Sequence, residues 1–401
     1  MMKIPGIVSG IFLKGADTVN FEELTEFLDS CPERFATYGG DLMVMHHHRP
    51  VYRHTFGMAD RKSGRKMQGN EVYRIYSCSK VATCTAIMKL MEEGKLSLDQ
   101  PLAEILPEFS RMQVQQTDEH GEKTLRPAKN PILIRHLLTM TAGMTYDCGS
   151  DPIRRVKEAT QGRVPTMDGV RAMAQMPLVF DPGDHWHYSL CHDVLGGVVE
   201  TLSGQKFSEY MTEHFFEPLG MRETFYHLLP QFADRYMPQY TRNSEGTLAT
   251  PMDPDNNAWF ELGSEYESGG AGVVSTVEDY IRFAEMLTSG GVTPSGRRLI
   301  SRESIDTMRK TYLPMEKLSE FGSRALGYSY ALGVRTHVNG PDEKSQSGKY
   351  EFGWDGAAGA YIEADPENEI SIYFGCSTRA PANGQIHPVI RNLVHRELNG
   401  K

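Results

Sequence analysis

A serine and a lysine three residues apart open an apolar stretch of this sequence, and together they could form a nucleophilic centre. Ser77 and Lys80 stand in the run Tyr-Ser-Cys-Ser-Lys, and residues 81–91 are apolar around the whole circumference of a helix. A helix that is apolar on every side is buried, and we expect this one to begin at Ser77. Residues three apart share a helix face, so the hydroxyl and the amine would lie side by side.

This placement would activate the serine. A hydroxyl is a poor nucleophile until a base takes its proton, and burial favours the neutral amine that could take it. Free N–H groups at the helix start could stabilise an oxyanion. The alternative is a capping serine followed by a surface lysine. Ser63 and Lys66 repeat the spacing, but in a polar turn with no apolar helix behind it.

Two further stretches could contribute to such a site. Tyr188 lies in the loop-like segment 182–190; loops often present catalytic groups, and a tyrosine beside a lysine cation could relay a proton. Its ring could instead simply pack in the loop. Gly356 and Ala357 open a strand, where a main-chain N–H could complete an oxyanion hole. A glycine-rich strand entrance or bulge is the alternative there.

Other chemistry-bearing patterns are weaker. Three consecutive histidines, 46–48, cannot all ligate one ion from a strand, because neighbouring side chains point to opposite faces. The group His185, His187, Cys191 and His192 lacks a second cluster at zinc-like spacing. The glycine run 269–272 lacks the strand and helix of a nucleotide loop, and no Gly-x-Ser-x-Gly elbow occurs. We expect neither a metal nor a cofactor.

Composition narrows the class of protein. The chain has 401 residues, 39% hydrophobic and 23% charged, which suits one large or two intimately packed globular domains. A net charge of −10 argues against nucleic acid as a partner. No apolar run is long enough to cross a membrane, and residues 1–14 lack a clean signal-peptide cleavage site. Six cysteines without paired spacing favour reduced thiols and a cytoplasmic location.

The elements that must position these residues change in type along the chain. Alternating or β-branched runs predict strands at both ends, whereas the middle is mainly helical. The expected strands are 41–47, 51–57, 328–337, 350–354, 358–364 and 370–376. The expected helices include 132–140, 193–202, 207–216, 277–287, 302–310 and a closing helix at 387–398, with a polar surface loop at 118–129.

This order of elements predicts an α/β (α+β) fold, with an antiparallel sheet that is flanked by helices and built from both chain ends. The two N-terminal strands need a sheet to join, and only the C-terminal strands can provide it. We therefore expect a discontinuous sheet domain, 1–72 with 325–401, and an inserted, mainly helical domain, 73–324. The active site is expected at their interface.

Taken in order, three motifs resemble those of the serine β-lactamase and penicillin-binding-protein superfamily. Residues 77–80, 188–190 and 354–356 correspond to its Ser-x-x-Lys, Tyr-x-Asn and Lys-Thr-Gly patterns. Supporting similarity runs along nearly the whole chain, at 134–143, 217–224 and 270–283. The chain is most similar to the class C-like branch and its family VIII carboxylesterases, which often have Trp-x-Gly as the third motif.

The resemblance implies a role for each matching residue. Ser77 would be the nucleophile, Lys80 its base or the base's partner, and Tyr188 the proton shuttle. Whether Lys80 or Tyr188 acts as the general base in each half-reaction stays open. The oxyanion hole would consist of the N–H groups of Ser77 and Ala357. The substrate-binding residues that the resemblance implies are Trp354, Asp355, Gly356, Leu190 and Tyr146.

Departures from the family motifs bear on the substrate. Leu190 stands where the family has Asn, and Trp354 and Asp355 replace Lys and Thr. An aspartate would repel the carboxylate of a β-lactam or a D-alanyl peptide by about 1 kcal/mol or more at ~4 Å. We therefore expect a serine hydrolase that cleaves small-molecule esters, and possibly lactones, through an acyl-serine.

Two alternatives remain open from the sequence. One is an amide-directed relative: a D-aminopeptidase, a DD-peptidase, a β-lactamase or a transacylase. The other belongs to a different class, a non-catalytic binding or scaffold member of the fold. The natural substrate, the acyl-chain preference and the oligomeric state are not determined by the sequence.

Overall fold

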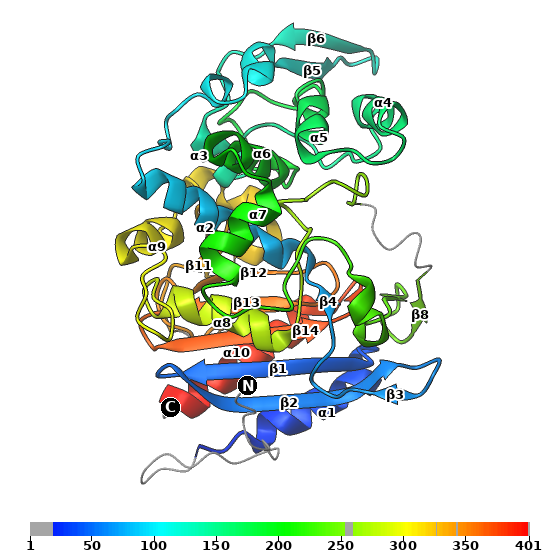
Figure 1. The fold of residues 1–401 in the computed structure, drawn as a ribbon, viewed down its shortest axis with the longest axis vertical. Coiled ribbons are helices and arrows are strands. Elements are labelled where there is room, and N and C mark those ends of the chain that lie inside the picture. The colour runs from blue at the N-terminus through cyan, green and yellow to red at the C-terminus, as the bar shows by residue number, and fades with distance from the viewer. Residues whose placement is uncertain (1–18, 253–259, 326, 342–343, 400–401) are drawn as a thin grey trace.

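The centre of the molecule is an eight-stranded antiparallel sheet (Figure 1). The structure is a computed structural model and describes residues 19–252, 260–325, 327–341 and 344–399. In spatial order the strands are β10 (Tyr328–Tyr330), β11 (Arg335–His337), β12 (Phe352–Asp355), β13 (Tyr361–Asp365), β14 (Ile370–Cys376), β1 (Gly39–His46), β2 (Arg49–Asp60) and β3 (Arg65–Lys66). Strands from the two chain ends meet where β14 pairs with β1, so the expected α/β architecture is confirmed.

Helices cover both faces of this sheet. Helices α1 (Glu22–Phe35) and α10 (Asn383–Asn399) pack on one face, and α8 (Val277–Thr288) packs on the other. The alternation of β1 explains this arrangement, because successive side chains of a strand point to opposite faces. Leu42 and Val44 join the apolar cluster of α1 and α10, whereas Met43 joins the larger cluster that includes α8.

The mainly helical part of the chain lies above the sheet in Figure 1. Its helices are α2 (Ser79–Glu92), α3 (Ile134–Leu138), α4 (Asp151–Ala159), α5 (Thr166–Met173), α6 (Cys191–Ser203), α7 (Phe207–Met211) and α9 (Arg302–Arg309). Helix α2 is buried around almost its whole circumference, as expected, and packs against α6 and α9.

Short elements complete the fold. The 3-10 turns are η1 (Tyr76–Cys78), η2 (Leu102–Glu104), η3 (Pro107–Arg111), η5 (Pro230–Arg235) and η7 (Met315–Ala325), and η4 (Thr212–Phe216) is a π turn. The small strands are β4 (Tyr73–Arg74) with β9 (Val274–Ser275), β5 (Gln113–Thr117) with β6 (Lys123–Pro127), and β15 (Thr378–Arg379) with β7 (Tyr240–Arg242) and β8 (Ala249–Pro251).

Three local expectations were wrong. The polar segment 118–129 is not a loop throughout, because β6 pairs with β5 in an exposed hairpin that has little apolar alternation to reveal it. The run 328–337 forms two strands, since the chain turns between them at Gly333, where φ is +81°. The helix does not begin at Ser77: that residue lies in η1, and α2 begins two residues later.

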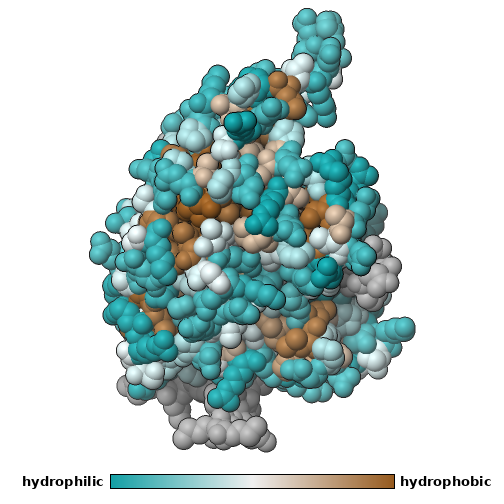
Figure 2. Space-filling view, turned by 45° about the horizontal axis from the view of Figure 1, so that its top comes forward, coloured by the Kyte–Doolittle hydropathy of each residue, from teal (hydrophilic) through white to brown (hydrophobic). Residues whose placement is uncertain are grey.

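The surface in Figure 2 is mainly hydrophilic, with apolar residues gathered in a few patches. None of the described helices combines the length and the apolar character needed to cross a membrane. The N-terminal segment 1–14, considered above, lies outside the described residues.

Candidate active site

Three side chains that are far apart in the sequence meet at one oxygen atom. The Tyr188 hydroxyl donates a hydrogen bond to Ser77 Oγ over 2.7 Å, and Lys80 Nζ donates to the same oxygen over 3.2 Å. Ser77 is 8% exposed and Lys80 is completely buried. The geometry thus brings a hydroxyl, an amine and a phenol into contact, at distances that allow direct proton transfer.

Ser77 sits on a strained turn at the entrance to α2. The preceding residue, Tyr76, has a φ of +50°, a left-handed conformation that residues with a Cβ rarely adopt. Its buried ring holds the turn: the hydroxyl donates to Gln239 Oε1 over 2.6 Å, and Phe260 packs edge-on at 5.1 Å. Such strain persists only where the surroundings enforce it, and it is concentrated at functional sites.

Lys80 is held from several sides. Besides Ser77, its Nζ donates to the carbonyl of Gly270 over 2.6 Å. The ring of Tyr188 lies 4.8 Å and that of Tyr146 lies 5.7 Å from Nζ, close enough for cation–π attraction. One turn further along α2, Thr83 donates to the carbonyl of Gly269 over 2.6 Å. The helix is therefore tied to the glycine run that begins at 269.

Stacked rings hold Tyr188 in place. Its ring lies between those of Tyr146 (5.7 Å, 8° between the planes) and Trp354 (6.0 Å, 11°). The loop backbone is fixed as well, because the N–H of His187 donates to the carbonyl of Met140 over 2.9 Å. Tyr146 and Trp354, expected to bind substrate, thus also orient the phenol.

Ser77 and Tyr188 open into a cleft of about 720 Å³. One wall is aromatic, and the rings on it contact one another at centroid distances of 5.2–6.4 Å. The other lining residues are more polar. The aromatic wall consists of Trp186, Tyr188, Phe321 and Trp354, and the other lining residues are Glu320, Asp355, Gly356, Ala357, Arg379, Ala380, Pro381 and Asn383.

The residues expected to form the oxyanion hole, Ser77 and Ala357, both line this cleft. Ser77 lies in the first turn of a helical segment, where backbone N–H groups lack intrahelical partners. Ala357 follows β12 in a turn that is closed by a 2.7 Å hydrogen bond from Gly356 N to the carbonyl of Ala360. Both residues thus border the cleft into which Ser77 opens.

Asp355 is not the isolated negative charge that the sequence suggested. Its Oδ1 accepts a hydrogen bond from Arg335 Nη1 over 3.2 Å and lies 3.5 Å from His387 Nδ1. Arg335 is buried and also binds Glu351 over 2.9 Å. A cation, Arg379, lines the same cleft. The expected repulsion of a substrate carboxylate is therefore largely offset, and shape and apolar contact carry more of the selectivity.

Not every expected substrate residue lines the cleft. Leu190 is 2% exposed and precedes α6 in the core, and neither it nor Tyr146, which stacks behind Tyr188, is part of the cleft lining. Trp354, Asp355 and Gly356 do line the cleft. Sequence reasoning missed other lining residues, and only Trp186 gave a signal, because it falls within the segment that presents Tyr188. The missed lining residues include Trp186, Phe321, Arg379 and Asn383.

The histidines of the two groups lie in separate surroundings. His48 binds the carboxylate of Glu285 over 2.5 Å, and His185 binds that of Glu320 over 2.7 Å. His192 is fully buried in α6. Within the described ranges, no group of three or more His, Cys, Asp or Glu side chains could hold a metal ion.

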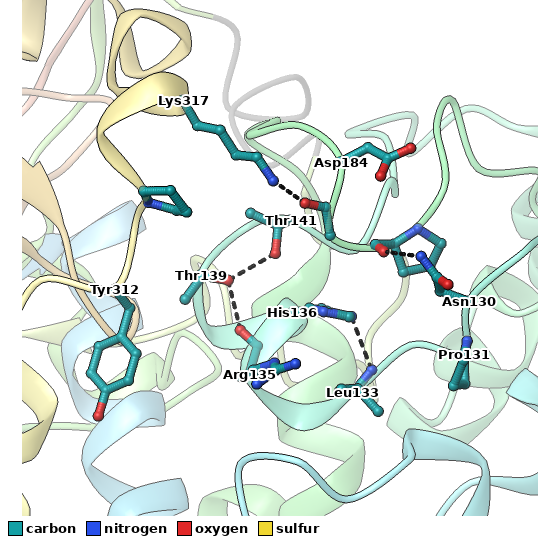
Figure 3. Close-up of a pocket in the computed structure, with 13 residues that line it drawn as sticks. Asn130, Pro131, Leu133, Arg135, His136, Thr139, Thr141, Asp184, Tyr312 and Lys317 are labelled. Atoms are coloured by element: carbon teal, nitrogen blue, oxygen red, sulfur yellow. Dashed lines mark hydrogen bonds between the residues drawn. The ribbon is translucent and has the colours of Figure 1, made fainter.

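A second cavity of about 600 Å³ is lined in part by Pro182, Gly183 and Asp184, which begin the loop that leads to Tyr188 (Figure 3). His136 lies in its wall, and its Nδ1 accepts the N–H of Leu133 over 3.2 Å. Lys317 donates from the other side to the carbonyl of Gly183. Burial, together with the charges of Arg135 and Lys317, lowers the pKa of His136 to about 4.

This lowered pKa should make the fold acid-sensitive. An unfolded chain takes up the imidazole proton near pH 6.5, whereas the folded protein takes it up only near pH 4. Stability is therefore lost as the pH falls from about 6.5 to about 4, by up to about 3 kcal/mol. In His136→Gln, whose amide can still accept the N–H of Leu133, we expect the free energy of unfolding to change less with pH between about 6.5 and about 4. Urea unfolding at a series of pH values measures this dependence. An unchanged slope would contradict this assignment.

Comparison with known proteins gives matches over most of the chain. A family model described as Beta-lactamase matches residues 24–394. Protein Rv1367c from Mycobacterium tuberculosis is 30% identical over 348 residues, which are 84% of either chain. Esterase EstB from Burkholderia gladioli is 33% identical over 269 residues, which are 62% of this chain and 65% of the esterase.

Solved structures show the same fold at lower identity. Simvastatin synthase (LovD) from Aspergillus terreus superposes with a TM-score of 0.78 at 22% identity, covering 94% of this chain and 98% of that one. EstCE1, a hydrolase with promiscuous acyltransferase activity, gives a TM-score of 0.76 at 22% identity, covering 93% and 98%.

Proposed function

Because the chain belongs to the Beta-lactamase family, we propose that it is a serine hydrolase that cleaves carboxylic esters through a covalent acyl-serine. The single observation that carries the proposal is the contact of Lys80 and Tyr188 with Ser77 Oγ, at 3.2 and 2.7 Å, beside an open cleft. The relationship to an esterase, EstB, supports the choice of ester.

In the first half-reaction, Ser77 Oγ attacks the ester carbonyl carbon as its proton passes to the pair formed by Lys80 and Tyr188. The carbonyl oxygen becomes an oxyanion, which the N–H groups of Ser77 and Ala357 stabilise. The C–O bond to the alcohol then breaks. The leaving alkoxide takes the proton from Tyr188, whose hydroxyl is the group that borders the cleft.

In the second half-reaction, water attacks the acyl-serine. The pair of Lys80 and Tyr188 accepts a proton from the water, and the same oxyanion hole stabilises the second tetrahedral intermediate. Ser77 leaves with that proton and the carboxylic acid is released. The chemistry needs no group beyond these side chains and backbone N–H groups, so we propose that no cofactor takes part.

The cleft favours a neutral ester with an apolar group. The rings of Trp186 and Tyr188 are partly exposed beside the nucleophile, and Phe321 and Trp354, each 2% exposed, pack behind them. Covering the exposed apolar surface of the two outer rings stabilises binding by about 25 cal/mol per Å². At the third motif, Trp354 occupies the position from which a lysine would meet a substrate carboxylate. In this protein the carboxylate of a β-lactam would therefore lack the contact with the lysine of the Lys-Thr-Gly motif.

We expect short-chain p-nitrophenyl esters to be hydrolysed with a far higher kcat/KM than a chromogenic cephalosporin, by at least about 10²-fold. Loss of a charge-assisted hydrogen bond to the carboxylate costs about 1.5–3 kcal/mol, or roughly 10–100-fold in kcat/KM. The family's second-motif Asn, whose place Leu190 takes here, is also missing, and this adds to the loss. Parallel steady-state assays on one enzyme preparation measure both activities. A clear preference for the cephalosporin would overturn the ester assignment.

A second candidate is acyl transfer from the acyl-serine to an alcohol in place of water. It is favoured by relatives named as acyltransferases, among them Acyltransferase calJ from Penicillium decumbens, 31% identical over 54% of this chain. Both reactions share the first half. Product analysis with an added alcohol separates them, because transfer yields a new ester whereas hydrolysis yields only the acid.

Two further expectations belong to this proposal. The division into a sheet domain (1–72 with 325–401) and a helical domain (73–324) is supported by the shared sheet of β1–β3 and β10–β14, and by a cleft lined from both parts. A cytoplasmic location is supported by the six cysteines, all of which are free, because disulfides are rare in reducing compartments.

A further inference from the structure

A buried carboxylate, Asp193, lies behind the candidate catalytic lysine and has no role in the reaction as described above. It sits in the first turn of α6 and is 2% exposed. Its Oδ1 accepts hydrogen bonds from the hydroxyls of Tyr266, over 2.8 Å, and Ser268, over 2.6 Å. The other oxygen, Oδ2, meets no hydrogen-bond donor among the described side chains.

Gly270 allows this carboxylate to approach Lys80. A Cβ on Gly270 would lie 2.6 Å from Asp193 Oδ2 and 3.4 Å from Lys80 Nζ. Asp193 Oδ2 and Lys80 Nζ are therefore at most 6.0 Å apart. The position that a Cβ would take lies close to both atoms, and Gly270 has no side chain to fill it. Any larger residue would push them apart. The carbonyl of Gly270 meanwhile accepts a hydrogen bond from Lys80 Nζ over 2.6 Å.

The charges make this proximity significant. An ammonium without a counter-charge in the protein interior is costly, and Lys80 is completely buried. Two hydroxyl donors favour the ionised form of Asp193. Burial raises the pKa of the Asp193 carboxyl, while the Ser268 hydrogen bond and the Lys80 charge oppose that rise. The titratable or polar groups that face Asp193 are Lys80, Tyr266, Ser268, Tyr146, Cys148 and Cys191.

We propose that Asp193 is a positioning residue that acts through Lys80 as its buried counter-charge; this inference rests on the proposed function. As Ser77 Oγ forms its bond to the carbonyl carbon, the serine proton moves to Lys80 Nζ. Asp193 takes no proton. Its negative charge stabilises the ammonium that has just formed, so it makes the amine a stronger base for acylation.

The test is the pH dependence of kcat/KM for a p-nitrophenyl ester in the variant Asp193→Asn. Asn keeps the shape of the Asp193 side chain and removes its negative charge. The protonated form of Lys80 is then less stable, so its amine loses the proton at a lower pH. We expect the acid limb of the profile to move down by about one to two pH units. The plateau should fall by at least about 10-fold, because a weaker base assists the attack less. A merely structural role would lower the rate equally at every pH.

Two more variants make the test decisive. Ser268→Ala removes a donor from the same carboxylate, which favours its neutral form, so the limb should move in the same direction by a smaller amount. Asp279→Asn is the control, because Asp279 is also a buried aspartate (4% exposed) in the first turn of a helix, α8, where it binds Thr224 over 3.2 Å and Arg282 over 2.9 Å. Its acid limb should stay in place.

The inference is overturned if Asp193→Asn and Ser268→Ala both leave the acid limb where it is in the unaltered protein. If Asp193→Asn does not fold, the result for Ser268→Ala decides. Failure of the proposed function looks different: the unaltered protein would then hydrolyse no ester, or Ser77→Ala would remain active. Either of those results is independent of the position of the limb.

Discussion

Ser77→Ala should abolish ester turnover, with a loss of at least about 10⁴-fold in kcat, because it removes the hydroxyl proposed to accept the acyl group. The substitution removes only one oxygen from a residue that is 8% exposed, so the fold should be unaffected. The measurement is steady-state hydrolysis of a p-nitrophenyl ester, together with covalent labelling by a fluorophosphonate probe.

The chain contains its own matched control. Ser63 and Lys66 repeat the Ser-x-x-Lys spacing, but Ser63 is exposed in a turn where its hydroxyl donates to Asp60 over 2.7 Å. Ser63→Ala should keep full turnover and full labelling. Retained turnover in Ser77→Ala would move the nucleophile elsewhere.

Tyr188→Phe should lower kcat by about 10²–10⁴-fold, which is the usual contribution of a general acid–base group. Phe keeps the ring that is stacked between Tyr146 and Trp354, so thermal unfolding should hardly change. Lys80→Met should cause a loss of similar size. The double variant should lose much less than the product of the two losses, because groups that act as a unit are not additive.

The same steady-state ester assay measures all three variants. Near-normal kcat in Tyr188→Phe would show that the phenol contributes only packing. Fully multiplicative losses would show that Lys80 and Tyr188 do not pass the proton between them.

How far the site could be predicted depends on how local each contact is. Ser77 and Lys80 are three residues apart in a helical segment, so their contact follows from helix geometry alone. The meeting of Tyr188 with Ser77 spans 111 positions, and no local pattern encodes it. The contact between Tyr188 and Ser77 was predicted only from the family resemblance, which rests on the order of three motifs along the chain.

The sheet shows the same distinction. Strongly alternating or β-branched runs such as β14 were predictable, and so was the joining of the two chain ends. The β5–β6 hairpin was not, because its residues are mostly exposed and leave no apolar alternation to detect. The left-handed Tyr76 could not be predicted either, since tertiary contacts with Gln239 and Phe260 enforce its conformation.

Charges were the hardest feature to predict from the sequence. Asp355 looked like an unpaired anion, yet Arg335, twenty positions earlier on a neighbouring strand, donates to it over 3.2 Å. The glycine run beginning at 269 matched no nucleotide loop. Its function becomes visible only in three dimensions, where Gly270 accepts from Lys80 and lets Asp193 approach.

The most direct test of the central claim is the intact mass of the protein after brief exposure to a panel of p-nitrophenyl esters, followed by peptide mapping. The account predicts a mass gain equal to one acyl group, located on the peptide that contains Ser77 and absent from Ser77→Ala. Ester turnover with no acyl adduct on that peptide, or an adduct that persists in Ser77→Ala, would contradict it.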